Sequence, residues 1–348
     1  MYFLAEQTPT QNLFKLGTLL VLILVLWGVI SFIFGCNFVP IPFSCDVYYG
    51  ILRFSENGQP KVLIVYGDGG LGNHELLQLT MEDPSILGLR SRTAYLETVS
   101  IGNLRDYDLV IVEEARKMSS SKLKMFMEYV NFGGRLIWTG DAGTQLGEGD
   151  ERLTEFERGN DSNSNEVANP WARKEEGKVV PFDEFLGVEY IGNFCELKNC
   201  LTTPYIGVLE APERNNKFVY SITPNLKMYG DFSVVKLRGS SASKVLLNVD
   251  TGGSIITDYV VPTSTTVTTT PPIASNAPTN VRTDTTFSKR NLGKIFPIVV
   301  QNGFGGRIIY YSIPPEFFVS DGMPTDPNTG QRIKYTSFIE NIYYGFFG

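Results

Sequence analysis

The stretch that decides the fold runs from Asp106 to Thr144 and reads DYDLVIVEEARKMSSSKLKMFMEYVNFGGRLIWTGDAGT. Leu109–Val112 is a short apolar run rich in β-branched residues, which is typical of a strand buried on both faces. A helical pattern follows, and Arg135–Thr139 is a second run of strand length. Two parallel strands need a crossover of this kind, so the stretch predicts an α/β domain with a parallel sheet.

The helix predicted between these strands has signals at both ends. Ser119, Ser120 and Ser121 are candidate N-caps. Apolar residues then recur at spacings of three and four, as expected of a helix with one buried face: Leu123, Phe126, Met127 and Val130. Gly133-Gly134 is expected to end the helix, because glycine adopts the left-handed conformation of a C-cap without strain.

Composition places the chain among ordinary globular proteins. It has 348 residues, of which 43% are hydrophobic, so it is long enough for one large or two medium domains with a full core. Its formal net charge is −7, and no stripe of lysine or arginine interrupts the acidic balance. This charge argues against nucleic acid as a partner.

The segment 16–35, LGTLLVLILVLWGVISFIFG, is strongly apolar, and no charged residue occurs between Lys15 and Asp46. A run of about 20 apolar residues is enough to cross a bilayer. A signal peptide and a buried core helix are the alternatives. The run is longer than the core of a signal peptide, no small-x-small cleavage site follows it, and it has no polar face. We therefore expect a single transmembrane helix at 16–35.

The flanks of this helix and the cysteines predict its orientation. Lys15 is the only basic residue before the helix, so the positive-inside rule places residues 1–15 in the cytoplasm. The chain has four cysteines in two close pairs: Cys36 with Cys45 and Cys195 with Cys200. This pattern fits disulfides of an oxidising compartment, although three connectivities are possible and only proximity favours the local pairs. A zinc site is the alternative, but the chain lacks C-x-x-C pairs and a second histidine.

These features predict a cell-membrane protein with an extracytoplasmic C-terminal domain. Residues 36–60 would form a disulfide-clipped stalk, and the domain would begin with a strand at Lys61–Tyr66. A glycine-rich loop, a helix near His74–Met81 and a second strand at Ala94–Ile101 are expected next. The predicted order β-α-β-β-α-β is compatible with a doubly wound sheet.

The second half of the domain predicts β-rich insertions. Residues 145–178 are polar and read as an exposed loop, in which Asn160 is a candidate glycosylation acceptor. Phe182–Gly192 predicts a helix followed by a strand, and 262–287 is a Thr/Pro-rich excursion with too few apolar residues to pack. Further strands are expected at Tyr205–Leu209, Phe218–Ile222, Phe232–Leu237, Lys244–Val249, Ser254–Val261, Ile295–Val300 and Arg307–Ile313. A closing helix is expected at Ser337–Tyr344, with the packed face formed by the aromatic residues of the tail.

Four pieces of the chain, in this order, resemble the class I glutamine amidotransferase-like superfamily: KVLIVYGDGG, YDLVIVEEARKMSSSKLKMFMEYVNFGGRLIWTG, FDEFLGVEYIG and NGFGGRIIYYSIPPEFF. The similarity is to the branch that includes trehalose-utilisation-type domains and membrane-anchored proteins, and it covers 61–348. It implies a flavodoxin-like doubly wound parallel sheet, here with β-rich insertions and preceded by one transmembrane helix.

The resemblance also implies where catalytic residues would lie. Active members carry a cysteine nucleophile in a tight strand-to-helix elbow and a histidine base downstream. The elbow here falls in Thr139–Gly143, where Asp141 stands in the place of the cysteine, and the only histidine, His74, lies far upstream. Nucleophilic catalysis needs a thiolate with a base in reach. We therefore expect a pseudoenzyme without amidotransferase activity, and His74 to be a polar helix-terminal residue.

Acidic residues nevertheless follow three of the predicted strands: Asp68, Glu113, Glu114 and Asp141. If those strands are neighbours, their carboxylates meet at the crevice where open α/β sheets bind ligands. Asp68, Glu113 and Asp141 could then hold a divalent cation, or divide the roles of acid and base in a hydrolase. The alternative is that they are solvated strand ends, helix caps or partners of lysine and arginine.

The loop after the first strand, GDGGLG, matches G-x-G-x-x-G at Gly67, Gly69 and Gly72. In this position the motif predicts a dinucleotide site, with Glu97 on the next strand reaching the ribose. Tyr66 and Asp68 crowd and charge a loop that would have to accept a pyrophosphate. An extracytoplasmic domain would also meet little NAD or ATP.

The sequence therefore favours a membrane-anchored binding or assembly protein whose partner at the cell surface is a protein or a carbohydrate. A hydrolase that uses Asp68, Glu113 and Asp141, with or without a metal, is one alternative. A structural subunit of a membrane complex is the other.

Overall fold

The computed structural model describes residues 17–23, 25–26, 60–154, 157, 169–198, 200, 205–239, 242–261, 286–303, 305–319 and 335–347. The chain divides into two compact units, Met1–Pro60 and Lys61–Gly348. In the first unit, residues 17–23 and 25–26 are helical, and the rest of the predicted membrane helix at 16–35 lies outside the described residues. Within the described ranges, no helix combines the length and the apolar character needed to cross a membrane.

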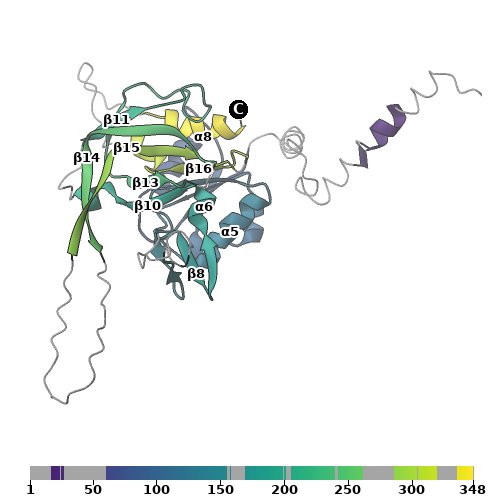
Figure 1. The fold of residues 1–348 in the computed structure, drawn as a ribbon. Helices are drawn as coiled ribbons and strands as arrows, with labels where there is room; N and C mark the ends of the chain where they lie inside the picture. Colours follow the sequence, from purple (N-terminus) through teal and green to yellow (C-terminus); the bar gives the residue numbers. More distant parts are fainter. Residues whose placement is uncertain are drawn as a thin grey trace, which may run out of the picture. The chain divides into compact units, whose positions relative to one another are not determined.

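The second unit is built on a nine-stranded sheet with the order β12-β11-β14-β15-β16-β5-β3-β1-β2. In that order the strands are Lys227–Tyr229, Tyr205–Glu210, Lys244–Val261, Thr286–Gln301, Ile308–Tyr311, Arg135–Thr139, Leu109–Glu113, Val62–Tyr66 and Ser91–Tyr95. The strands from β16 to β2 are parallel, and the pairings from β16 to β12 are antiparallel. The predicted parallel α/β sheet is therefore present, and an antiparallel half extends it. β14 and β15 form a long pair that projects past the other strands (Figure 1).

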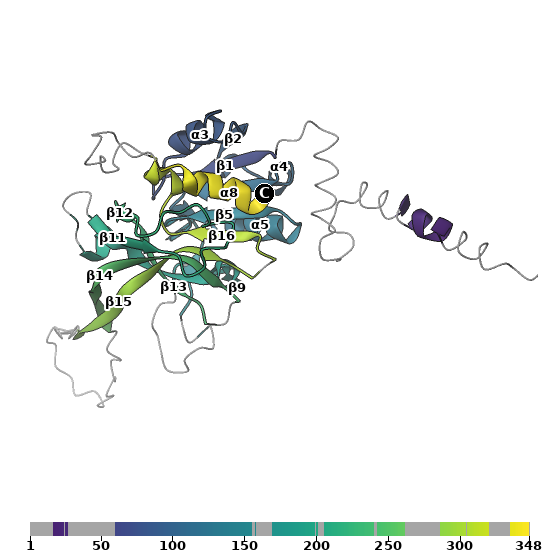
Figure 2. The same ribbon diagram turned by 90° about the horizontal axis from the view of Figure 1, so that it is seen from above.

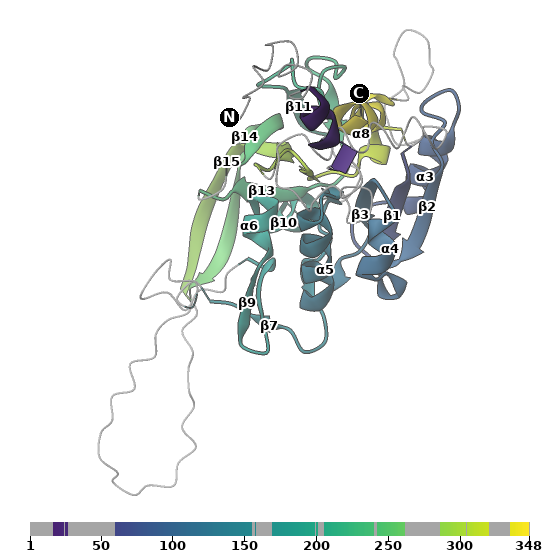
Figure 3. The same ribbon diagram turned by 90° about the vertical axis from the view of Figure 1, so that its right-hand side faces the viewer.

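Helices cover both faces of the parallel strands, as can be followed in Figure 2 and Figure 3. One face is covered by α3 (His74–Glu82), η3 (Pro315–Phe318) and α8 (Ser337–Phe347). The other is covered by η2 (Leu96–Thr98), α4 (Ile101–Arg105), α5 (Ser120–Asn131) and α6 (Phe182–Leu186). Alternate residues of each strand point to opposite faces, so each parallel strand contributes to both cores.

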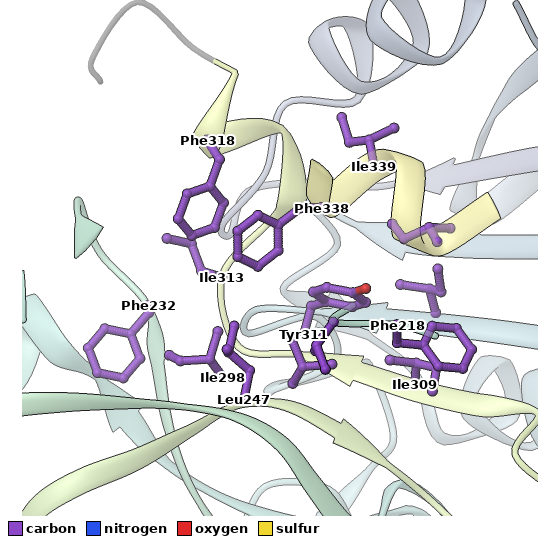
Figure 4. Packing of buried hydrophobic residues seen from close by; sticks show 14 of the residues in the cluster. Phe218, Phe232, Leu247, Ile298, Ile309, Tyr311, Ile313, Phe318, Phe338 and Ile339 are labelled. Carbon is purple, nitrogen blue, oxygen red and sulfur yellow. The ribbon is translucent and has the colours of Figure 1, made fainter. Parts of the chain in front are cut away.

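The core under α8 is aromatic (Figure 4). Phe318 of η3 and Phe338 of α8 stack with their ring centroids 3.9 Å apart, and Tyr311 of β16 is fully buried beneath them. Ile339 and Ile342 are also buried. The prediction that the closing helix presents a packed aromatic face to the domain is confirmed.

The helix of the deciding stretch forms as predicted. Ser119 is its N-cap, and the Ser119 hydroxyl accepts a hydrogen bond from the Lys122 amide. The side chains of Leu123, Phe126, Tyr129 and Val130 are buried at helical spacing. Gly133 follows the helix with a φ of +96°, the left-handed conformation that glycine adopts without strain.

The second strand of the sheet is not where the sequence predicted it. β2 ends at Tyr95, and η2 and α4 take up the rest of the predicted strand Ala94–Ile101. Ser100 and Asn103 form a capping box, in which each side chain accepts a hydrogen bond from the backbone amide of the other. This local signal starts α4 and overrides the β-branched run, so the order becomes β-α-β-α-β-α-β.

The prediction of an exposed loop at 145–178 holds only in part where the chain is described, since Glu151 and Arg152 are exposed but Trp171 and Arg173 are buried, while Asn160 lies outside the described residues. The segment forms short strands: β6 (Gln145–Leu146), β7 (Glu151–Arg152), β8 (Ala172–Glu175) and the start of β9 (Lys178–Pro181). β6 pairs with β4 (Lys117–Met118). Trp171 is fully buried, and its indole N–H donates a hydrogen bond to the Ala142 carbonyl at 2.9 Å. This tertiary contact fixes the position of a segment whose composition is polar.

The other insertions follow the predictions only in part, because β12 was not predicted and β15 begins at Thr286, inside the predicted excursion 262–287 and before the predicted strand Ile295–Val300. α6 leads into β10 (Val188–Asn193), which pairs with β13 (Ser233–Leu237), and α7 (Phe194–Lys198) follows β10. Residues 218–222 form turns and not a strand, because Phe218, Val219 and Ile222 are buried on one side of them. β14 is one strand with irregular register between Asp250 and Ile255, where two were predicted. Residues 262–285 of the Thr/Pro-rich excursion lie outside the described ranges.

Candidate functional site

The carboxyl ends of β1, β3 and β5 meet at one edge of the sheet. The chain leaves β1 for β2 on one side and returns to β3 on the other, so the strand order reverses between β1 and β3. Ligands of open α/β sheets bind at such a switch point. The acids predicted from the sequence all lie here, but in different surroundings.

The elbow after β5 is a tight turn without a reactive side chain. Its first left-handed residue is Gly140, with a φ of +55°, one position before the Asp141 that the sequence placed there. The Gly140 amide donates to the Tyr311 carbonyl at 2.7 Å, and the Tyr310 hydroxyl donates to the Gly140 carbonyl at 2.9 Å. A Cβ on Gly140 would lie 2.8 Å from the Cβ of Leu71, so the space for a side chain is already filled.

Asp141 is enclosed, with 1% of its side chain exposed. Its Oδ1 accepts a hydrogen bond from the Leu71 amide at 2.7 Å, and its Oδ2 accepts one from Asn193 Nδ2 at 2.9 Å. The Arg116 guanidinium lies 3.3 Å from Oδ2 and also pairs with Glu196 at 2.6 Å. Both oxygens are thus engaged by protein donors, and Asp141 joins the loop after β1 to β10.

The glycine-rich loop folds back onto the end of β3. The Gly67 amide donates to the Glu114 carbonyl, and the amides of Glu114 and Arg116 donate to the carbonyls of Leu71 and Gly69. A Cβ on Gly70 would lie 2.8 Å from Asp141 Oδ1, and one on Gly72 would lie 3.0 Å from the Glu114 nitrogen.

Packing against protein therefore accounts for Gly70 and for the predicted nucleotide contact Gly72, whereas nothing lies within 4 Å of a Cβ on Gly69, whose φ of +68° alone favours glycine. The amides of Gly67 and Leu71 donate to protein acceptors. Glu97, the predicted ribose ligand, lies in η2 and is exposed instead of standing on a strand.

Glu114 and His74 form a pair that the sequence did not predict. Glu114 adopts a φ of +48°, which is strained for a residue with a side chain, and its Oε2 lies 2.7 Å from His74 Nδ1. The imidazole stacks on the Tyr66 ring with centroids 3.7 Å apart. His74 is the first residue of α3, as expected, and 21% of its side chain is exposed.

Asp68 is exposed and bonds to a tyrosine of the neighbouring strand. Its Oδ2 accepts a hydrogen bond from the Tyr95 hydroxyl at 2.9 Å, and this bond raises the pKa of the tyrosine. Among the described residues, no group of three or more His, Cys, Asp and Glu side chains is arranged to hold a metal ion. The predicted cation ligands Asp68, Glu113 and Asp141 are not brought together as one such group.

Glu113 is fully buried, and its neighbour is an acid that sequence reasoning missed. Glu316 of η3 is also fully buried, and its Oε1 accepts a hydrogen bond from the Asn73 amide at 2.8 Å. Burial and the nearby Glu316 raise the pKa of Glu113 well above its usual range, and burial raises the pKa of Glu316 to about 8. The only sequence signal was an acid inside the apolar run Ile313–Phe318, which follows another strand of the same sheet.

A groove of about 440 Å³ lies on the antiparallel half of the sheet, where β11 and β14 face the turn at 222–225. Its polar lining comes from Glu210, Arg214, Thr223, Asn225 and Asn248, among aliphatic side chains. Asn225 adopts a left-handed φ of +60°. No motif in the sequence marks these residues as a site.

One of the two predicted disulfides is confirmed. Cys195 and Cys200 are bonded, with their Cα atoms 4.7 Å apart, and the bond closes the turn of α7 beside Glu196. Cys36 and Cys45 lie outside the described residues.

No protein-family model matches the chain, and no curated protein matches its sequence. A solved ThuA-like protein from Bacteroides uniformis has a TM-score of 0.44 at 15% identity, over 82% of this chain and 92% of that one. A ThuA-like protein from Parabacteroides merdae has a TM-score of 0.37 at 12% identity, over 82% and 90% of the two chains. A β-galactosidase from Bacillus circulans has a TM-score of 0.42 at 10% identity, over 90% of this chain but 35% of the enzyme.

Proposed function

We propose that this chain is a membrane-anchored binding or assembly protein. Its amidotransferase-like domain would be non-catalytic and extracytoplasmic, and it would meet a protein or carbohydrate partner at the cell surface. The membrane helix at 16–35 and the cytoplasmic residues 1–15 are proposed from the apolar run and from Lys15. The Cys195–Cys200 disulfide supports an oxidising compartment.

One observation carries the non-catalytic part of the proposal, namely the contact between position 140 and Leu71. A nucleophile elbow works by presenting a side chain to substrate from a strained turn. Here the left-handed residue is glycine, which presents no side chain, and Leu71 fills the space in front of it. Restoring a nucleophile would need a new side chain and also a new path for the loop after β1.

The hydrolase alternative has less support. Glu113 and Asp141 are 0% and 1% exposed, and Asp68, the third acid, bonds to Tyr95 in a separate, exposed setting. A general acid or base must come within hydrogen-bond reach of substrate. Two of the three acids would need the glycine-rich loop to move before they could do so.

The groove beside β11 offers a place for a partner. Arg214 and Glu210 supply opposite charges at its rim, and Thr223, Asn225 and Asn248 supply donors and acceptors without net charge. This mixture suits the amide groups of a peptide or the hydroxyl groups of a glycan.

Protease treatment of intact source cells tests the location. We expect the domain 61–348 to be digested from outside while a tag before Lys15 stays protected, and Cys195–Cys200 to be found oxidised by mass spectrometry. Digestion only after the membrane has been opened would place the domain in the cytoplasm and refute the proposal.

Photo-crosslinking in native membranes tests the binding role. A photoreactive residue at Thr223 should give a defined adduct, whereas the same residue at Arg92, exposed on β2 at the other end of the sheet, should not. An adduct made only of copies of this chain would favour the structural-subunit alternative. Hydrolysis of esters, amides or glycosides by the purified chain, abolished by Asp141→Asn, would favour the hydrolase.

A further inference from the structure

Two buried carboxyl groups at the switch point lack the partners that buried charges need. Glu113 and Glu316 are both fully buried. Within the described part of the chain, neither carboxyl oxygen of Glu113 has a hydrogen-bond partner, and Oε2 of Glu316 has none either. The one satisfied oxygen, Glu316 Oε1, accepts the amide hydrogen of Asn73, the N-cap of α3.

The side chains around this pair supply no positive charge. Glu114 follows Glu113 and adds a further negative charge, although its carboxylate is paired with His74 at the start of α3. In the ranges that the structure describes, no lysine or arginine forms an ion pair with Glu113 or Glu316.

A proton is the simplest means of stabilising such a pair. Two carboxylates have only acceptor oxygens, so they cannot bond to each other while both are ionised. One proton turns either group into a donor and allows an O–H···O⁻ bond, which is short and strong. Leaving both groups ionised without a cation would cost several kcal/mol for each buried charge.

We propose that Glu113 and Glu316 share one proton and form a pH-sensitive latch that holds η3 against the start of α3. With the proton present, the end of β3 is joined to η3, and η3 to the amide of Asn73. When the proton leaves, two negative charges repel each other in a site that water does not reach. The contact between η3 and the start of α3 then loosens, and the glycine-rich loop, which ends at Asn73, gains freedom. This inference is independent of the binding role proposed above.

Infrared spectroscopy of the full-length chain in mild detergent tests the shared proton directly. With ¹³C-labelled glutamate, the wild type should show a protonated-carboxyl band at about pH 6 that weakens as pH rises through about 8, the pKa of Glu316. The variant Glu113→Gln/Glu316→Gln should lack this band, and Glu75→Gln, which changes an exposed acid in α3, should keep it. A wild type without the band at about pH 6 would refute the shared proton.

Hydrogen exchange of the same samples tests the latch. After correction for the intrinsic effect of pH, exchange in peptides covering 70–77 and 315–319 should rise several-fold between about pH 6 and about pH 9, while α5 stays unchanged. The variant Glu113→Gln/Glu316→Gln should show no such rise. Equal pH responses of the variant and the wild type would overturn the latch. So would protection of both peptides by Mg²⁺ or Ca²⁺ alone at the higher pH, because a cation would then hold the pair.

Discussion

Leu71 occupies the space that a side chain at position 140 would need, since a Cβ on Gly140 would lie 2.8 Å from the Cβ of Leu71. Gly140 has the left-handed backbone of an elbow, with a φ of +55°, at the end of β5. The turn that would present a nucleophile is therefore present, and the loop after β1 closes the space in front of it. This contact and the polar groups around it should have measurable effects on the stability of the fold.

Gly140→Ala should be strongly destabilising. The new methyl group would add a strained left-handed φ to the overlap with Leu71, and together these should lower the free energy of unfolding by about 2–4 kcal/mol. Urea denaturation of the purified chain measures the change. Gly69→Ala is the matched control, because Gly69 has a φ of +68° but nothing within 4 Å of its Cβ position. A similar loss in both variants would mean that Leu71 does not restrict position 140.

Asp141→Asn should destabilise the fold by about 1–3 kcal/mol, because the new amide would place donors opposite Asn193 and Arg116. The exchange Asp141→Asn/Asn193→Asp should recover part of the loss. In the double variant, the amide at position 141 can donate to the carboxylate at position 193, and that carboxylate can still accept from Ser233. Denaturation of the two variants and of Asn193→Asp completes the cycle. If the double variant were less stable than the sum of the single changes, the hydrogen bond between residues 141 and 193 would not be the link that we infer.

Arg173→Met should lower the free energy of unfolding by about 3–5 kcal/mol. The change removes the guanidinium that donates hydrogen bonds to the carbonyls of Met118, Gly143 and Pro170. It also leaves the buried Asp150 carboxylate without its cation. Loss of these bonds should also release β7, β8 and β9, which proteolysis would detect as early cleavage in this region. Arg152→Met on the exposed strand β7 is the control and should change stability by less than about 0.5 kcal/mol. If Arg173→Met and Arg152→Met changed stability equally, the buried guanidinium would not be what anchors β7, β8 and β9.

Stability should fall as pH rises from about 4.5 to about 8. The pKa of Glu316 is raised in the folded chain, from 4.5 to about 8, so the folded state keeps a proton that the unfolded state has released. Stability from this group is complete below the unfolded pKa and is lost as pH rises through the folded pKa. For one proton, the free energy of unfolding should fall by about 1.4 kcal/mol per pH unit.

Thermal unfolding between about pH 4.5 and about pH 8 measures how the free energy of unfolding changes with pH. This change should be smaller in the variant Glu113→Gln/Glu316→Gln than in the wild type. Glu75→Gln should follow the wild type, because Glu75 is exposed. A wild type whose stability rises over the same range would contradict a pair of buried acids that holds a proton.

Local patterns predicted much of the parallel half of the sheet. β1, β3, α5 and β5 lie where apolar periodicity, Ser119 and Gly133 indicated them, because strand burial, caps and glycine turns depend on neighbours in the sequence. The same reasoning failed at β2, where the capping box of Ser100 started a helix, and at 145–178, where Trp171 and Arg173 are buried by contacts distant in the sequence.

The sequence by itself determined the α/β class, the absence of a cysteine at the elbow and an apolar segment long enough to span a membrane, and it favoured the Cys195–Cys200 pair by proximity alone. Only the tertiary structure decided how the acids are used. Four acids lie at or just after the ends of strands, and the sequence does not distinguish their surroundings: Asp68, Glu113, Glu114 and Asp141. The loop after β1 encloses Asp141, η3 brings Glu316 beside Glu113, and α3 brings His74 to Glu114. The ionisation and reach of a carboxyl group depend on its solvent and its neighbours in space, and these come from segments up to 243 residues apart in the chain.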